Sequence, residues 1–424
     1  MSTQPTRVGV VGLGYIGLPL ALAMHNAGYE VVGVDIDEDT VESLRNGTST
    51  VNDVSDAEVT DAVAEGLRIT TDYAELADID GVSVCVPTPL GKTDTPDLSF
   101  VVDAAERLAG VISAGCTVVL ESTVYPGATE EVVGETLAAS GAAIGRDVHL
   151  AFSPERIDPG NETYGPTEIP KVLGGVTPAC GDRAEALYDP VFEEVVRVDS
   201  ATEAELVKLL ENTFRAVNIG LINELAQVAH ELDVDIWNAI DAAETKPFGF
   251  MAFRPGPGLG GHCIPIDPFY LSWKASEQGI DTRFIHLADT VNREMPDHVV
   301  GRVVEQLNDR GVPLPEADVL VVGVAYKPDV SDTRESPAVD IIDGLEEWHA
   351  DVDYHDPHVP TLSVADRTYE SVPLTDDRIE AADCVVLVTD HSTLDIERLV
   401  GRSSLLFDTR NATTGLEAEN VVRL

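Results

Sequence analysis

A single cysteine at the end of a glycine- and proline-rich stretch is the first candidate for chemistry in this sequence. The stretch runs from Arg254 to Asp267, with Cys263 after its glycines and Asp267 four residues further on. Gly and Pro disfavour helix and strand, and glycines let backbone N–H groups approach an anionic ligand closely. A nucleophilic thiol needs an exposed position and a nearby group that manages protons. The pattern therefore predicts a shaped loop that presents Cys263 as a nucleophile, in preference to a buried structural cysteine.

The other four cysteines show no pattern of metal or disulfide chemistry. Cys85, Cys116 and Cys384 lie in or beside apolar, strand-like runs, and no CxxC pair includes them or Cys180. We expect the first three to pack in the core. We expect neither a disulfide framework nor a metal site.

Length and composition predict a large globular protein. The 424 residues, 44% of them hydrophobic, are too many for one core, so two or three domains are expected. No apolar run reaches the ~18 residues of a membrane span, and the N-terminus lacks the basic and apolar regions of a signal peptide. We therefore expect a cytoplasmic protein.

The chain is strongly acidic, with 75 Asp and Glu against 27 Lys and Arg and a net charge of −48. The charge is spread through every segment, as in halophilic proteins, whose self-repulsion is screened by salt. It disfavours nucleic acid and anionic membranes as partners. Only six residues are Lys, which makes Lys208 and Lys327 informative.

Residues 7–37 read as a strand, a glycine turn, a helix and a second strand. Gly12, Gly14 and Gly17 fit the pattern GxGxxG, and Asp35 ends the second strand. The glycines permit a tight turn and close approach of a pyrophosphate to the helix N-terminus. Asp35 would accept hydrogen bonds from a ribose 2′-hydroxyl and repel a 2′-phosphate. The segment therefore predicts an NAD-binding domain.

Three later strands of this domain lead to polar residues. These are Thr88, the run from Glu121 to Thr123, and the pair Glu155 and Arg156. Ligands of a doubly wound sheet bind beyond the carboxyl ends of its strands. We expect these residues to meet the nicotinamide or the substrate, with a simple strand cap as the alternative for each.

Apolar residues recur at three- and four-residue steps over 202–232 without an intervening proline. This predicts one long helix, which we expect to bridge two halves of the chain and to form part of an oligomer interface. Lys208 and Asn212 are four residues apart and share one face of it. They are candidates for a polar pocket, although any single lysine is more often a surface residue.

Residues 314–424 contain a second alternation of strands and helices, without GxGxxG. Lys327 and Arg334 would give it positive charge for a phosphate-bearing ligand. The predicted fold class is α/β, with two Rossmann-like doubly wound domains joined by a long central helix and a helical dimerisation domain. We place the NAD-binding domain at 1–198, the central domain with the cysteine loop at 199–305, and the second Rossmann-like domain at 306–424.

NAD together with a reactive cysteine narrows the chemistry. A simple alcohol oxidation needs no nucleophile, whereas a thiol assists aldehyde oxidation, because hydride leaves a thiohemiacetal readily and gives a thioester that water cleaves. Two nucleotide-type domains further suggest that the substrate is linked to a nucleotide.

As a set, these motifs resemble the UDP-glucose/GDP-mannose dehydrogenase family of nucleotide-sugar 6-dehydrogenases, and most closely its UDP-N-acetylglucosamine and UDP-N-acetylmannosamine branch. The resemblance covers nearly the whole chain. Its most specific motifs are GLGYIGLPL at 12–20, VPTP at 86–89, EST at 121–123, FSPER at 152–156, KLLEN at 208–212, PGPGLGGHC at 255–263 and YKPDVSDTRES at 326–336.

The resemblance implies a four-electron oxidation of a sugar C6 alcohol to a carboxylate, with two NAD+ and no metal, for surface polysaccharide or glycan precursors. Cys263 would attack the C6 aldehyde, and Lys208 and Asn212 would stabilise the alkoxide and the later oxyanion. Asp267 would position or activate the hydrolytic water. Thr123 would share that role, and Glu155 would line the sugar or help to order the same water.

The resemblance also implies a homodimer built on the long helix, and two sets of binding residues. The set for NAD is Gly12, Gly14, Tyr15, Ile16, Gly17, Asp35, Pro87, Thr88, Thr123 and Arg334. The set for the UDP-sugar, whose diphosphate the glycine loop 255–262 would cradle, is Glu155, Arg156, Lys208, Asn212, Arg254, Gly256, Gly258, Gly260, His262 and Lys327.

Two positions favour an N-acetylated sugar. UDP-glucose dehydrogenases usually carry Lys where this chain has Ile266, and a second Glu where it has Pro159. The run 264–273 is more similar to the UDP-N-acetylglucosamine enzymes. That sugar is therefore favoured, with UDP-N-acetylmannosamine as the alternative and UDP-glucose behind both.

Two other classes compete with this interpretation. A two-electron hydroxyacid dehydrogenase would use the Gly12 turn and Lys208 but would leave Cys263 and the last domain without a role. An inactive nucleotide-sugar binding protein predicts the loss of Cys263, Lys208 or Asp267, and the chain retains all three.

The charge generates a first prediction, that the protein needs high salt. Unscreened carboxylates repel one another, so dialysis from high into low salt should lower both activity and the unfolding temperature. Circular dichroism and NADH formation before and after dialysis check this. Full structure and activity in low salt would contradict it.

Overall fold

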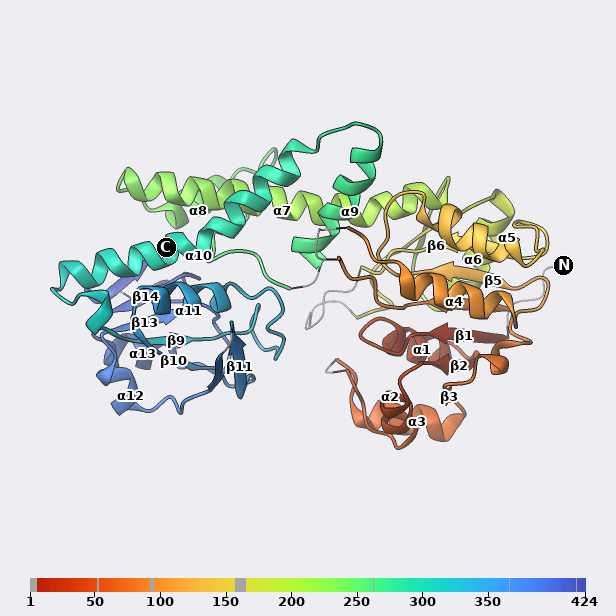
Figure 1. Ribbon diagram of the computed structural model, residues 1–424, viewed down its shortest axis with the longest axis horizontal. Coiled ribbons are helices and arrows are strands. Elements are labelled where there is room, and N and C mark those ends of the chain that lie inside the picture. The colour runs from red at the N-terminus through yellow and green to blue at the C-terminus, as the bar shows by residue number, and fades with distance from the viewer. Residues whose placement is uncertain are drawn as a thin grey trace. The chain divides into compact units, whose positions relative to one another are not determined.

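The computed structural model describes residues 6–51, 53–91, 95–156, 165–261, 263–365, 367–416 and 418–424 (Figure 1). These residues form two compact units, and each is described by itself. The first lies within Met1–Glu211 and Phe269–Ile280, and the second within Asn212–Pro268 and Asp281–Leu424.

The first unit is built on an eight-stranded sheet in the order β3-β2-β1-β4-β5-β6-β7-β8. Neighbouring strands are parallel except β6 and β7. The strands are β1 (Arg7–Val11), β2 (Glu30–Val34), β3 (Arg68–Thr70), β4 (Gly81–Val84), β5 (Thr117–Leu120), β6 (His149–Phe152), β7 (Lys171–Gly175) and β8 (Val195–Val198). The first six strands in this order match the arrangement of a dinucleotide-binding Rossmann sheet, as predicted.

Helices connect these parallel strands, as crossover connections require. They are α1 (Gly17–Asn26), α2 (Glu38–Arg45), α3 (Asp56–Glu65), η1 (Tyr73–Leu76), α4 (Ser99–Ala109), η2 (Thr129–Gly134), α5 (Glu135–Ala139) and α6 (Pro178–Tyr188). Strands β4, β5 and β6 are buried along their whole length, as expected for a sheet covered on both faces.

The second unit contains a five-stranded parallel sheet in the order β10-β9-β13-β14-β15 and a separate antiparallel pair, β11 and β12. Its strands are β9 (Asp318–Val322), β10 (Asp351–His355), β11 (Thr361–Val364), β12 (Arg367–Glu370), β13 (Cys384–Leu387), β14 (Leu406–Asp408) and β15 (Val421–Arg423). Its helices are α8 (Ile236–Glu244), α10 (Arg283–Asp309), η3 (Leu314–Glu316), α11 (Pro337–Glu347), α12 (Asp376–Ala381) and α13 (Ile396–Arg402). The predicted second Rossmann-like sheet is therefore confirmed.

Two further helices, α7 (Ala201–Glu231) and α9 (Cys263–Glu277), contribute residues to both units. The 31 residues of α7 confirm the predicted long helix. Helix α9 was not predicted, because its prolines obscured it. Pro265 falls in the first turn, where a missing N–H costs nothing, and Pro268 lies inside the helix. Among the described residues, none of the helices is both long and apolar enough to cross a membrane.

One carboxylate of α7 is buried in the first unit. Glu205 is 1% exposed and accepts hydrogen bonds from the backbone N–H groups of Gly127 (2.5 Å) and Thr129 (2.7 Å). Burial outweighs these hydrogen bonds and raises the pKa of Glu205 to about 7. The folded protein therefore holds this proton more tightly than the unfolded chain does.

This pKa gives a stability prediction. The stabilising effect of the proton is fully present below the unfolded pKa, near 4.5, and is lost as the pH rises through about 7. Across that window wild type should lose about 3 kcal/mol of unfolding free energy relative to Glu205→Gln, which carries no titrating group. Denaturant unfolding in high salt between pH 5 and pH 8 measures this, with exposed Glu130→Gln as the control. Parallel pH profiles for wild type and Glu205→Gln would refute the assignment.

Candidate active site

The turn between β1 and α1 has the geometry of a nucleotide site. Gly12 has a φ of 88°, and a Cβ there would lie 2.6 Å from the carbonyl oxygen of Cys85. A Cβ at Gly17 would lie 1.7 Å from the carbonyl oxygen of Gly12. A Cβ at Gly14 would meet nothing within 4 Å. Two glycines therefore let the turn pack closely, and the third borders open space beside the start of α1, which fits a pyrophosphate.

Asp35 lies directly after β2 and is held against this turn. Its carboxylate accepts hydrogen bonds from the N–H groups of Leu13 (2.8 Å) and Asp37 (3.0 Å). A carboxylate has about four acceptor positions, so capacity is left for ribose hydroxyls. Tyr15 is exposed and Ile16 is half-buried. These residues fit the pyrophosphate and ribose of NAD.

The ends of β4 and β5 meet at one edge of the same sheet, since the two strands are parallel neighbours. The Ser122 hydroxyl donates to the carbonyl oxygen of Val86 at 2.6 Å. Thr88 is buried, and its carbonyl oxygen accepts a hydrogen bond from the Tyr270 hydroxyl at 2.7 Å. Thr123, two residues beyond the buried Glu121, is half-buried. The two strand ends thus bring polar groups to one edge of the sheet, and their contact with the nicotinamide or the substrate stays a prediction.

A buried ionic cluster joins the ends of β5 and β6 to the start of β7. Lys171 Nζ lies 2.5 Å from Glu121 Oε2 and 3.3 Å from Glu155 Oε2. The Tyr188 hydroxyl donates to Glu121 at 2.5 Å. Burial acts to lower the pKa of Lys171, but the charges of Glu121 and Glu155 outweigh it and hold that pKa above its usual range. The ammonium therefore stays charged and is shared by two carboxylates.

Neighbouring Glu155 and Arg156 have different surroundings. Glu155 Oε1 accepts a hydrogen bond from the Arg156 N–H at 2.6 Å, and its other oxygen faces Lys171. The Arg156 guanidinium instead pairs with Glu211 at 2.7 Å. Of the two, Glu155 is the residue that belongs to the ionic cluster.

In the second unit, three of the predicted residues lie together. Asn212 Nδ2 donates to Asp267 Oδ2 at 2.6 Å, and Asp267 is 1% exposed. Cys263 lies one turn before Asp267 on α9. Lys208, assigned to the first unit, is buried and lies one turn before Asn212 on α7.

Cys263 alone of the five cysteines is exposed. It is the first residue of α9, and the positive end of a helix dipole favours an anionic thiolate. Burial raises the pKa of Cys116 and of Cys384 to about 12. The predicted burial of Cys85, Cys116 and Cys384 is confirmed. Cys263 is therefore the cysteine placed for nucleophilic chemistry.

The glycine loop before Cys263 packs against the segment 326–336. A Cβ at Gly260 would lie 2.7 Å from Tyr326 Cβ, and one at Gly261 would lie 2.7 Å from Tyr326 Cε2. The Gly261 N–H donates to the carbonyl oxygen of Arg334 at 3.0 Å. Earlier in the loop, Gly258 has a φ of 136° and the Gly256 N–H donates to a side-chain oxygen at 3.0 Å. These glycines thus have a packing role that the sequence did not reveal, and their contact with a diphosphate stays a prediction.

The predicted cationic residues of this unit have acidic or aromatic neighbours. Arg254 pairs with Asp241 (2.5 Å) and Glu244 (2.8 Å) of α8. Lys327 is half-buried, with Nζ 5.8 Å from the centre of the neighbouring Tyr326 ring. Arg334 pairs with the neighbouring Asp332 at 2.6 Å. His262 and Pro159 lie outside the described residues.

Sequence reasoning missed Lys171, Asp356 and His391. The sequence contained an indication of Lys171, because it is a charged residue at the start of an apolar strand in a lysine-poor chain. Asp356 and His391 follow β10 and β13. The rule that ligands and their supports gather at the carboxyl ends of strands, applied to the second sheet, would have found them.

Family models match three consecutive parts of the chain. They are the NAD binding domain of the UDP-glucose/GDP-mannose dehydrogenase family over 6–192, the central domain over 202–294 and the UDP binding domain over 320–415.

Individual relatives agree with the family models. The chain is 34% identical to a UDP-N-acetyl-D-mannosamine dehydrogenase of Methanococcus maripaludis, over 96% of this chain and 92% of the relative. It is 37% identical to a UDP-N-acetyl-D-glucosamine 6-dehydrogenase of Pseudomonas aeruginosa, over 91% and 90%. The solved structure of a UDP-D-ManNAc dehydrogenase from Pyrococcus horikoshii superposes with a TM-score of 0.89 at 33% identity, covering 99% of this chain and 98% of that one. The chain therefore belongs to the UDP-glucose/GDP-mannose dehydrogenase family and is an NAD-dependent nucleotide-sugar dehydrogenase.

Proposed function

We propose that the enzyme oxidises the C6 alcohol of a UDP-N-acetylhexosamine to a carboxylate in two two-electron steps. The observation that carries this proposal is the exposed Cys263 at the head of α9, with Asp267 one turn away and bonded to Asn212. An alcohol dehydrogenase that stopped at the aldehyde would need no such thiol. The names of the relatives support the UDP-N-acetylhexosamine as substrate class.

Cys263 has the central role in the second oxidation. Bound NAD+ would supply the hydride acceptor for both oxidations. The Cys263 sulfur adds to the C6 aldehyde and gives a thiohemiacetal. Loss of hydride from C6 leaves a thioester, and water cleaves it to the carboxylate and the free thiol.

The residues around this chemistry stabilise charge and order water. Asn212 donates one amide N–H to Asp267, which leaves its second N–H to donate to the alkoxide or oxyanion, together with the Lys208 ammonium. Asp267 and Thr123 position the hydrolytic water. Glu155, paired with Lys171 at 3.3 Å, lines the sugar or orders the same water.

We propose that the sugar nucleotide is held by Lys327 and the glycine loop, with Arg334 at a phosphate of substrate or NAD. This assigns the domains 1–198, 199–305 and 306–424 to NAD, to the cysteine loop with dimerisation, and to the UDP-sugar. The run 264–273 favours UDP-N-acetylglucosamine, whereas several relatives are named for UDP-N-acetylmannosamine. Both epimers are therefore assayed.

We further propose a homodimer through α7. In the second unit, this helix and the residue just past its end expose five large apolar side chains, which is unusual for a solvated surface. They are Phe214, Leu221, Leu225, Val228 and Leu232, the last of them just past the end of the helix.

The reaction predicts two NADH for each sugar consumed. UDP-N-acetylglucosamine, UDP-N-acetylmannosamine and UDP-glucose are compared side by side in high salt, with NADH measured by absorbance and the acid product by mass. Two NADH from the N-acetylglucosamine substrate are expected. Two NADH from the mannosamine epimer alone would correct the sugar and keep the mechanism, whereas one NADH from every substrate would refute the four-electron reaction.

Cys263 gives an independent prediction. In the native protein a thiol reagent should modify one cysteine per chain rapidly, because the other four are buried. Cys263→Ala should lose both this reaction and at least ~10³-fold in steady turnover, since its thioester cannot form. Cys180→Ala, at a buried cysteine, is the matched control and should retain both. Turnover by Cys263→Ala near the wild-type rate would show that the thiol is not the nucleophile.

A further inference from the structure

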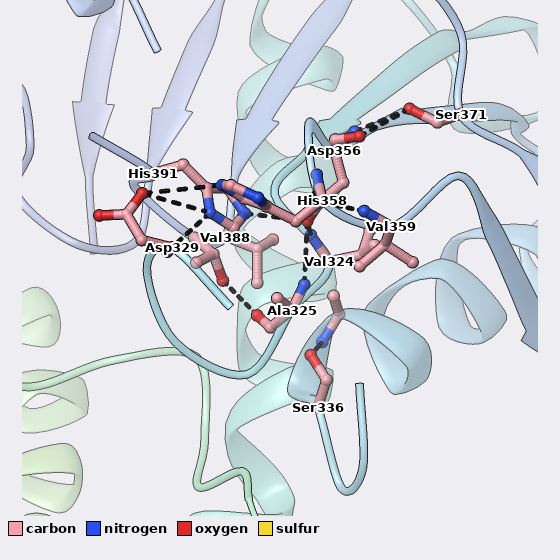
Figure 2. Close-up of polar contacts among 12 residues, drawn as sticks. Val324, Ala325, Asp329, Ser336, Asp356, His358, Val359, Ser371, Val388 and His391 are labelled. Carbon is pink, nitrogen blue, oxygen red and sulfur yellow. Dashed lines mark hydrogen bonds and ion pairs between the residues drawn. The ribbon is translucent and has the colours of Figure 1, made fainter. Parts of the chain in front are cut away.

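We propose that Asp356 and His391 are positioning residues that fix the backbone on both sides of Lys327, and so hold this lysine for the nucleotide of the substrate. The inference rests on the proposed function in one respect, the contact of Lys327 with the UDP moiety. The positioning itself is built entirely from described residues of the second unit (Figure 2).

Asp356 joins the ends of two neighbouring strands. It follows β10, and its Oδ2 accepts hydrogen bonds from the N–H groups of Val324 (2.7 Å) and Ala325 (3.1 Å), directly after β9. Its Oδ1 accepts from the N–H groups of His358 (2.8 Å) and Val359 (3.1 Å). Burial acts to raise the pKa of Asp356, but hydrogen bonds from His391 and the backbone outweigh it and lower that pKa to about 2. The carboxylate is therefore a permanent, saturated acceptor.

His391 extends this anchor to the far side of Lys327. Its side chain is fully buried, with Nε2 2.9 Å from Asp356 Oδ2. Its Nδ1 accepts the backbone N–H of Asp329 at 3.0 Å. A backbone N–H can only donate, so Nδ1 must carry a lone pair and Nε2 must carry the proton that it donates to Asp356. The two contacts together select one neutral tautomer.

The residues next to Lys327 are thus held from both directions. The Thr389 hydroxyl also donates a hydrogen bond to the carbonyl oxygen of Ala325 at 2.6 Å. Asp329 has a φ of 61°, and its carboxylate accepts hydrogen bonds from the N–H (2.9 Å) and hydroxyl (3.0 Å) of Ser392. A left-handed conformation persists at a non-glycine residue only when its surroundings over-determine it. The short segment that carries Lys327 therefore has a fixed path before any ligand binds.

A metal site is the competing interpretation of this cluster. Asp329, His358 and His391 offer ligand atoms within 4.8 Å of one another. Both ring nitrogens of His391 are already engaged, however, so a metal at His391 would break either the Asp329 or the Asp356 contact. The observed hydrogen bonds therefore favour a positioning role for His391 over a metal site.

Substitution of His391 by Asn or by Gln distinguishes its hydrogen bond with Asp329 from its hydrogen bond with Asp356. In His391→Asn the side-chain oxygen can take the place of Nδ1 and accept the Asp329 N–H. In His391→Gln the amide reaches the place of Nε2, and the Asp329 N–H loses its acceptor. We expect His391→Gln to raise both KM for the UDP-sugar and Kd for UDP by about tenfold, with smaller changes in kcat and in KM for NAD. His391→Asn should stay within about threefold of wild type. His349→Gln, at an exposed histidine of the same unit, is the control.

Lys327→Met distinguishes failure of the inference from failure of the proposed function. If Lys327→Met leaves UDP binding by calorimetry unchanged, the assignment of Lys327 to the nucleotide is wrong. If it weakens UDP binding while His391→Gln does not, the positioning role is wrong. UDP binding that EDTA abolishes and zinc restores would overturn the inference in favour of the metal site.

Hydrogen exchange of the wild type keeps the test decisive even where a variant does not fold. Without UDP, the peptide that covers 324–329 should exchange as slowly as the β9 strand before it, because its amides are already held. Rapid exchange of that peptide in the unliganded protein would contradict the inference.

Discussion

Both sheets depend on the same hydrogen-bonding constraint. In each unit, a carboxylate that follows the second strand accepts hydrogen bonds from N–H groups of the turn that follows the first strand. In the first unit Asp35 accepts from Leu13, and in the second Asp356 accepts from Val324. Each turn begins with a glycine at positive φ, 88° at Gly12 and 79° at Gly323. Without these acceptors, the N–H groups that follow β1 and β9 would be left unpaired at the point where each chain leaves its sheet.

This carboxylate has different consequences in the two units, because the number of acceptor positions that it has left for a ligand differs. Asp35 is half-buried and accepts two backbone N–H groups, so it retains positions for ribose hydroxyls. Asp356 is buried and saturated by four backbone N–H groups and His391. It can bind no ligand, and recognition in the second unit must come from the residues that it supports. The first sheet has a nucleotide fingerprint in its sequence, whereas the second, with a similar turn, has none.

Interactions between residues close together in the sequence could be predicted, whereas those between distant residues could not. The turn from Gly12 to Asp35 and the helix α7 depend on spacing within one stretch of chain, and both were predicted correctly. The pairs Glu121–Lys171 and Asp329–His391 lie 50 and 62 residues apart, and only the order of the strands brings them together. The sequence analysis missed helix α9 for another reason. Prolines disfavour a helix, but here one lies in the first turn and one is tolerated at an interior position.

The acidity of the chain affects how anionic ligands reach its cationic side chains. A UDP-sugar and NAD are anions, so a surface with a net charge of −48 repels them at long range. Salt shortens the range of that repulsion, to ~10 Å at 0.1 M and ~3 Å at 1 M. Contacts at hydrogen-bond distance are much less affected, because screening acts on separations longer than this. Salt would then serve binding as well as folding, by removing the distant repulsion while the fixed lysine backbone keeps the short attraction in place.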